Sequence, residues 1–238
     1  MISERRAAGI LLHISSLPNR YGIGTMGKAA YSFVDLLSES KIKYWQILPL
    51  VQTSYGDSPY QSAYSGSGNP YFIDLEFLVE EGLLKKSELS ACRNTKSKID
   101  YAFLYKNKYA VLRGAYERFD VHGADFVSFV GQGRFGGYAL FMSIKEKFGG
   151  APFDKWPNKY KFARAKSLQK FKKENEKEYL FWQFLQYEFS LQWKALKGYA
   201  NKKGVSISRP IIFPLRGSFG ATPSITGRYI KRTAILGG

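Results

Sequence analysis

The sequence predicts an α/β fold in which two parallel strands precede a large helical segment and a third strand follows it. Two short apolar runs, residues 8–14 and 44–50, have the length and flanking turn residues of buried strands. A helical pattern lies between them, and a much longer helical region begins after Phe77.

The first run, Ala8–Ile14, ends in the turn-rich segment Ser15–Arg20. Periodicity alone does not separate a buried strand from a buried helical segment here. Glycines 22, 24 and 27 then lead into a helix that starts at about Lys28. Its core-facing residues are spaced at i, i+3, i+4 and i+7, as on one face of a helix: Ala30, Phe33, Val34 and Leu37.

The second run, Tyr44–Leu50, completes a strand–helix–strand unit, which implies parallel strands. We therefore predict that the two strands are adjacent and parallel. We also expect residues 10–14 and 45–50 to be largely buried.

A long loop, Val51–Pro70, follows the second strand, at the end where barrel enzymes build their active sites. Its segment Gly56–Ser62 concentrates hydroxyls, an amide, a carboxylate and aromatic rings. Sugars are bound by such mixtures, because rings stack on their apolar faces while polar groups meet their hydroxyls. An ordinary Ser/Gly/Pro turn cluster explains the composition equally well.

The remainder is mainly helical, with weak breaks near residues 123–137 and 149–157. The clearest helix runs from about Glu178 to Tyr199, and residues 205–207 begin a third strand. A TIM-type barrel needs eight strands, and only two or three are visible here. If the architecture is such a barrel, the expected fold is an incomplete (β/α)8 barrel, its first two or three strands, with a large helical insertion. We divide the chain into a first βαβ unit with its loop (1–75), the helical insertion (76–200), and a third-strand start with a basic tail (201–238).

The net charge of +17 raises nucleic acid as a partner. Much of it is local, because Lys155–Lys177 holds nine Lys and Arg against two Glu, and Ser208–Gly238 holds five basic residues and no acid. We interpret the first stretch as the solvated face of a linker and helix. A basic nucleic-acid-binding protein is therefore the less favoured alternative.

The composition also bounds the environment. A single cysteine, Cys92, excludes an intrachain disulfide and suits a reducing compartment. No apolar run approaches ~18 residues, and the first residues lack the apolar segment of a secretory signal. We expect a cytoplasmic protein with no membrane partner.

Single residues taken alone do not indicate a catalytic or metal-binding site. His13 reads first as a histidine satisfied within the core, and His122 as a surface residue. Cys92 has no His or Cys at ligand spacing, so no metal site is predicted. The glycines of 22–27 match G-x-G-x-x-G, but a turn containing Pro18 precedes them and no acid ends the next strand. No cofactor is predicted.

Several longer segments are informative together: residues 9–18 with 21–24, 45–50, 55–62 with 68–75, 138–141 with 145–150, and 186–189 with 192–193 and 199–201. They resemble segments of the amylomaltases, the disproportionating 4-α-glucanotransferases of bacteria and plants. The resemblance covers about Ala8 to Ile207 in consistent order.

The chain departs from this family's pattern in three places. The family usually has Gly-Asp-Leu-Gly where Gly24–Gly27 stand, and acidic residues where Gly136 and Gly137 stand. The third strand should continue as Gly-Asp-Ile-Pro, whereas a basic tail that matches nothing begins at Ser208. We expect a frameshift or assembly error there, and a chain that stops before the catalytic half.

The resemblance implies a retaining α-glucanotransferase acting on α-1,4-glucans such as maltooligosaccharides. An aspartate attacks the anomeric carbon, a glutamic acid protonates the leaving oxygen, and a second glucan displaces the enzyme, which requires two carboxyls about 5 Å apart. These catalytic residues, and a second aspartate that distorts the sugar, lie on later strands, so no residue here is catalytic. A non-catalytic glucan-binding protein is the alternative.

The resemblance also implies substrate-binding residues. Ser58 and Tyr60 would contact glucose near the cleavage point, and Tyr55 would stack on glucan at a more remote site. His13 and Ser15 would lie near the pocket floor. The loop would be shaped by three further residues, whose roles are equally explained as structural: Asp57, Gln61 and Asn69.

Overall fold

The structure, a computed structural model, describes residues 6–53, 58, 60, 62, 64 and 66–208. Its strands are β1 (Gly9–Leu11), β2 (Tyr44–Gln46) and β3 (Ser206–Ser208). Its α-helices are α1 (Lys28–Glu39), α2 (Leu75–Glu80), α3 (Tyr101–Tyr116), α4 (Ala124–Gly131), α5 (Gly136–Lys147), α6 (Asn158–Lys161), α7 (Ala165–Glu174) and α8 (Glu176–Lys202). Short 3-10 helices span Ile14–Ser16, Pro70–Phe72, Lys86–Cys92 and Phe153–Lys155.

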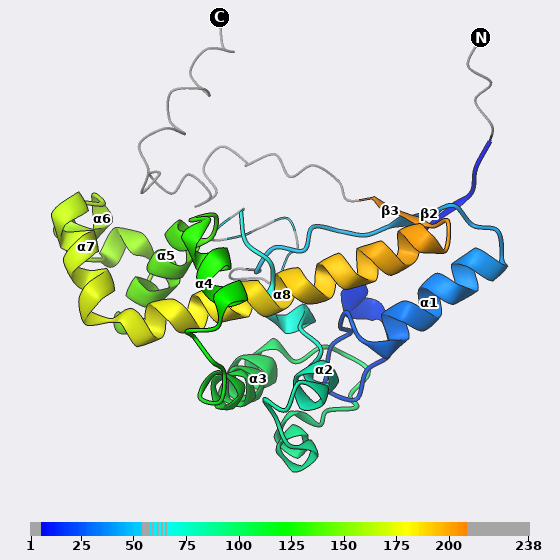
Figure 1. The fold of residues 1–238 in the computed structure, drawn as a ribbon, viewed down its shortest axis with the longest axis horizontal. Helices are drawn as coiled ribbons and strands as arrows, with labels where there is room; N and C mark the ends of the chain where they lie inside the picture. Colours follow the sequence, from blue (N-terminus) through cyan, green and yellow to red (C-terminus); the bar gives the residue numbers. More distant parts are fainter. Residues whose placement is uncertain are drawn as a thin grey trace, which may run out of the picture.

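The three strands form one parallel sheet in the order β1-β2-β3. Ile10 pairs with Trp45, and Trp45 pairs with Ile207. Helix α1 makes the crossover between β1 and β2, as the sequence predicts, and Figure 1 shows it beside the strands at one end of the molecule. The predicted third strand is also confirmed, one residue later than expected.

Burial along the strands corrects one expectation. Trp45 is fully buried, with its ring 5.0 Å from that of Phe33 on α1, and residues 13–14, 47 and 49–51 are buried as predicted. Ile10 and Leu11, however, are 39% and 58% exposed. Ile10 lies on an edge strand, and Leu11 shares with Gln46, also exposed, the sheet face opposite to Trp45.

Helix α8 spans most of the molecule and organises the helical region around it (Figure 1). It packs on α5, α1, α3 and α4 before leading into β3. Apolar residues spaced along one side of α8 form a stripe in the core: Phe181, Leu185, Phe189 and Leu196 are buried and Trp193 is half-buried. The weak break at 123–137 nevertheless contains α4, because Phe126 is held in the core between the rings of Phe119 and Tyr187.

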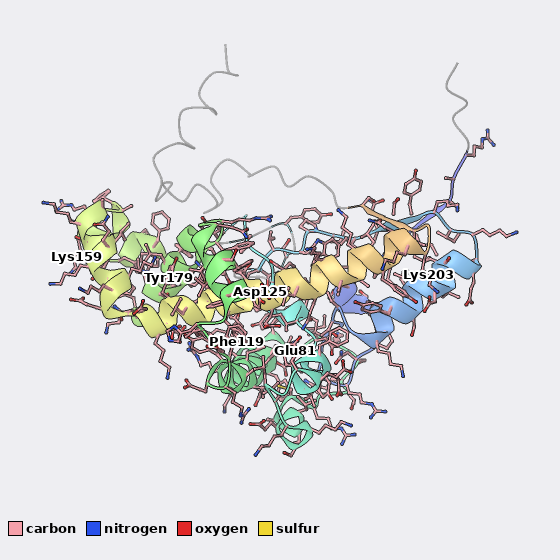
Figure 2. All side chains as sticks on the ribbon, viewed as in Figure 1. Glu81, Phe119, Asp125, Lys159, Tyr179 and Lys203 are labelled. Carbon is pink, nitrogen blue, oxygen red and sulfur yellow. The ribbon has the colours of Figure 1, made fainter. Side chains whose placement is uncertain are left out.

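The basic stretch 155–177 forms α6, α7 and the start of α8 at the end of the molecule away from the sheet, where Figure 2 marks Lys159. All its Lys and Arg residues except half-buried Lys161 are exposed, as expected of a solvated face. The expectations for the tail concern residues 209–238, which lie outside the described residues. In the described part of the chain, no helix is both long and apolar enough to cross a membrane.

Candidate functional site

A small cavity of about 160 Å³ lies where β1 and β2 end. The turn after β1 brings His13, Ser15 and Ser16 to it, and the segment after β2 brings residues 48–53. Asn69 and Phe72 close it from the 3-10 helix Pro70–Phe72, and Tyr101 from the start of α3. Three of the predicted site residues, His13, Ser15 and Asn69, are therefore brought together at the carboxyl ends of parallel strands.

His13 is a buried polar group of this cavity that is incompletely hydrogen-bonded among the described residues. It is 8% exposed, its ring meets Phe72 edge-on at 5.2 Å, and its Nδ1 has no hydrogen-bond partner among the described residues. Burial lowers the pKa of His13 to about 4, so the imidazole is neutral at pH 7. The histidine is therefore buried, as expected of a core residue, but its Nδ1 is not hydrogen-bonded to any described residue, and a neutral imidazole can meet a ligand hydroxyl here.

Asn69 has a structural role at the cavity wall. Its side-chain Oδ1 accepts a hydrogen bond from Tyr71 N at 3.0 Å, and its N–H donates to Leu50 O at 2.7 Å. Buried Lys108 supports the same turn, donating from Nζ to Tyr71 O at 2.6 Å. Asn69 therefore links the end of the loop to the segment that follows β2.

The loop's other predicted contacts are only partly described. Tyr60 is 52% exposed and donates its N–H to Ser58 Oγ at 3.3 Å, and neither residue lines the cavity. Tyr55, Asp57 and Gln61 lie outside the described residues.

Two glutamines of α8 hold the end of the loop and the segment that follows it. The carboxamide of Gln186 accepts from Gly68 N at 2.7 Å and donates to Gly68 O at 2.9 Å. Gln192 does the same for Asp74, at 2.7 and 3.2 Å. Each side chain satisfies one donor and one acceptor of a buried backbone, which fixes the segment against α8.

Two departures from the amylomaltase pattern have local explanations. Thr25, which is 3% exposed, donates its hydroxyl to the carboxylate of Asp74, the N-cap of α2. A Cβ at Gly137 would lie 2.7 Å from the Tyr64 hydroxyl, so glycine lets Tyr64 pack on α5, where its ring lies 5.7 Å from that of Tyr138. Asp74 is thus a structural carboxylate rather than a free one.

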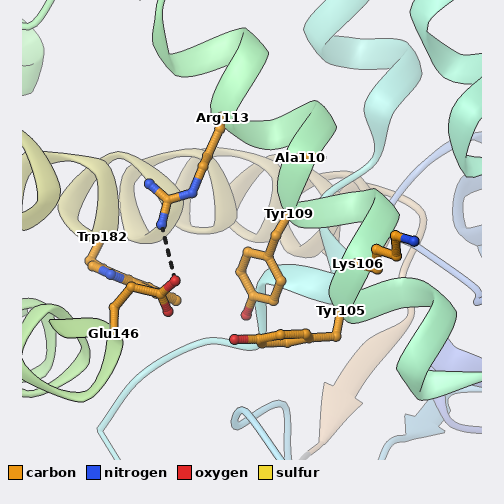
Figure 3. A pocket seen from close by; sticks show the side chains of 7 residues that line it. All are labelled: Tyr105, Lys106, Tyr109, Ala110, Arg113, Glu146 and Trp182. Atoms are coloured by element: carbon orange, nitrogen blue, oxygen red, sulfur yellow. Dashed lines mark ion pairs between the residues drawn. The ribbon is translucent and has the colours of Figure 1, made fainter. Parts of the chain in front are cut away.

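A second cavity, of about 250 Å³, is lined by residues of α3, α5 and α8, and we call it the outer cavity; the sequence pattern had not been interpreted as a site. Tyr105 and Tyr109 have ring centroids 5.7 Å apart, and Tyr105 is 58% exposed (Figure 3). Arg113 lies beside them, 3.9 Å from Glu146 and in a two-bond ion pair with Glu178 that raises the Arg113 pKa. Tyrosines recur every fourth residue from position 101, and this spacing was the available signal.

The outer cavity combines aromatic rings with paired charges, as surfaces that bind sugars do. The strand-end cavity, in contrast, lacks the groups that hydrolysis or transfer requires. None of the described residues lining it carries a carboxyl group. The described residues also contain no group of three or more His, Cys, Asp or Glu that could hold a metal ion. The arrangement can bind a polyhydroxylated ligand, and it offers no acid–base pair.

Comparison with known proteins gives a consistent result. The family model for 4-alpha-glucanotransferase matches residues 12–214, so the expectation that the sequence matches nothing from Ser208 onward is wrong for residues 208–214. The 4-alpha-glucanotransferase of Clostridium butyricum is 45% identical over 82% of this chain and 41% of its own length. That of Streptococcus pneumoniae is 42% identical over 86% of this chain and 42% of its own. The chain spans about two-fifths of these relatives.

Solved structures agree in fold. The amylomaltase from Streptococcus agalactiae in complex with acarbose superposes with a TM-score of 0.80 at 37% identity, over 86% of this chain and 43% of that one. The amylomaltase from Corynebacterium glutamicum superposes with a TM-score of 0.65 at 20% identity, over 84% and 29%, and supports the fold alone.

Proposed function

The chain belongs to the 4-alpha-glucanotransferase family, and on that premise we propose that it supplies the glucan-binding part of an amylomaltase-type transfer reaction. The observation that carries the proposal is the cavity at the ends of β1 and β2, where Nδ1 of neutral His13 has no hydrogen-bond partner among the described residues. A family of glucan transferases and a polar cavity at parallel strand ends point to the same ligand class.

The fold proposal is that β1, β2 and β3 are the first three strands of a (β/α)8 barrel. Their parallel order and the α1 crossover support it. Residues 1–75 would form the first unit, 76–200 a helical insertion built on α3, α5 and α8, and 201–238 the start of the third unit. The structural likeness to the amylomaltase from Streptococcus agalactiae supports this division.

We assign the ligand as an α-1,4-glucan or maltooligosaccharide. The S. agalactiae protein was solved in complex with acarbose, which is an oligosaccharide analogue, and this supports the assignment. His13 and Ser15 would meet sugar hydroxyls, and Asn69 would hold the wall. Ser58 and Tyr60, with Tyr55, Asp57 and Gln61, would contact the same chain from the loop.

The tyrosines of α3 extend this proposal. Tyr101 lines the strand-end cavity, and Tyr105 and Tyr109 line the outer one, so one helix borders both. A glucan leaving the first cavity along α3 would meet the exposed ring of Tyr105. We propose this outer cavity as a secondary glucan contact.

We further propose that the 238-residue chain binds glucan without transferring it, in the cytoplasm and without a metal or cofactor. The absence of carboxyl groups from the described lining of the cavity supports this, because double displacement needs two.

Two measurements on the purified chain with maltotriose test the proposal: binding of the sugar and release of glucose. We expect saturable maltotriose binding that His13→Ala weakens, and no glucose release above a blank. Glucose release abolished by Asp57→Asn or Asp74→Asn would contradict the assignment of catalysis to other residues. No binding of any maltooligosaccharide would reject the glucan-binding function itself.

A further inference from the structure

A third cavity, of about 400 Å³, adjoins the strand-end cavity, and Ser15 and Ser16 lie in the walls of both. It is bounded on one side by the turn after β1 and on the other by Asn94, Lys96 and Ser97, in the loop before α3. The strand-end cavity alone, at about 160 Å³, is smaller than most ligand pockets, which begin at roughly 300 Å³. The adjoining cavity, at about 400 Å³, lies within that range by itself.

Backbone hydrogen bonds and close packing hold the wall of this cavity. Gly24 N donates to Ser15 O at 3.1 Å, and a Cβ at Gly24 would lie 1.9 Å from Ile14 O, so only glycine allows this close approach. Across the cavity, Asn94 N donates to Arg20 O at 2.9 Å, which joins the two bounding segments. A ligand would therefore meet a preformed surface.

The lining has the chemistry of a sugar contact. Ser15, Ser16 and Ser97 have hydroxyls that form no hydrogen bond to any other described residue, and Ile99 adds an apolar surface. None of the described lining residues is acidic, and Lys96 already pairs with Asp100 at 3.3 Å. Free hydroxyls beside an apolar patch fit a neutral polyhydroxylated ring better than an anion.

We infer that the two cavities form one channel, and that the cavity beside Ser97 holds further glucose units of the glucan bound at His13. This inference rests on the proposed glucan-binding function and adds a place for chain extension. Longer maltooligosaccharides should therefore bind more tightly than maltotriose. Two added neutral hydrogen bonds correspond to about a tenfold gain in affinity.

The test substitutes Ser97→Trp, because this exposed side chain borders the cavity and an indole would fill it. Lys98→Trp is the matched control, since Lys98 is the exposed neighbour and does not line the cavity. Titration calorimetry with maltotriose and maltoheptaose gives the ratio of the two dissociation constants for each protein.

We expect the maltotriose dissociation constant to be about ten times that of maltoheptaose in the parent and in Lys98→Trp. In Ser97→Trp, whose indole fills the cavity, this ratio should fall toward one while the maltotriose affinity is retained. A ratio near one in the parent, or a ratio that Ser97→Trp leaves unchanged, would overturn the channel while leaving the glucan site standing. Failure of both sugars to bind the parent would instead reject the proposed function, and with it the channel.

Discussion

The buried carboxyl of Glu188 should make the stability of the protein fall as the pH rises. Glu188 on α8 is 1% exposed, its Oε2 has no hydrogen-bond partner among the described residues, and its neighbour is the carboxyl of Glu81 at the end of α2, marked in Figure 2. Burial, and then the charge of Glu81, raises the pKa of Glu188 from 4.5 to about 8. The folded state thus binds a proton that the unfolded chain releases.

The sign and size of the effect follow from linkage. Because the pKa is raised on folding, the stabilisation is complete below pH 4.5 and is lost as the pH rises toward about 8. Between these values each pH unit costs about 1.4 kcal/mol, so moving from pH 5 to pH 7 lowers the free energy of unfolding by about 3 kcal/mol. Glu188→Gln keeps the shape of the side chain and stays neutral at every pH, so the part of the pH dependence of stability that comes from Glu188 should disappear.

Urea unfolding of the parent and of Glu188→Gln at pH 5, 6 and 7 measures the effect. We expect similar stabilities at pH 5 and a variant more stable by about 3 kcal/mol at pH 7. Glu39→Gln, an exposed glutamate at the end of α1, should follow the parent at every pH. Parallel pH profiles for the parent and Glu188→Gln would refute a protonated Glu188 at neutral pH.

The remaining predictions concern the contacts that hold the loop against α8. Gln186→Glu removes the donor to Gly68 O and buries a charge, so urea unfolding should show a free energy of unfolding lower by about 3 kcal/mol or more. The exposed control Gln169→Glu should change the free energy of unfolding by less than about 0.5 kcal/mol. Equal effects would show that the carboxamide contact is not stabilising. Gly68→Ala would place a Cβ 2.2 Å from the ring of Phe189 and should destabilise by about 1–3 kcal/mol, while Gly198→Ala in α8 meets nothing within 4 Å and should stabilise by up to about 1 kcal/mol. A neutral Gly68→Ala would mean that the segment does not pack on Phe189 as described.

Local pattern was sufficient for the βαβ unit and for the buried stripe of α8. Apolar runs surround Ile14 and Ile47, and Val34 and Leu37 have helical spacing between them. This order predicts two parallel strands joined by a crossover helix, because parallel neighbours need such a connection. Exposure of Leu11 was not predictable in the same way, because a strand residue is buried only where another element covers its face of the sheet.

The sequence indicated three residues of the strand-end cavity, including distant Asn69, but not the contacts that hold the loop against α8. His13 and Ser15 come from one turn, and the resemblance to a known family pointed to them. The clamps of Gln186 and Gln192 join residues 118 positions apart, and no local pattern indicates which backbone a buried glutamine meets. The tyrosine spacing of α3 was visible, but only the packing shows that Tyr105 stays exposed.

Hydrogen exchange with and without maltoheptaose, read by mass spectrometry, tests most directly whether this chain binds glucan at the ends of its parallel strands. The account predicts slower exchange in residues 12–17 and 48–53, which carry the strand-end cavity, and no change in the basic stretch 155–177. Unchanged exchange around His13 at a saturating sugar concentration, or protection confined to other surfaces, would contradict it.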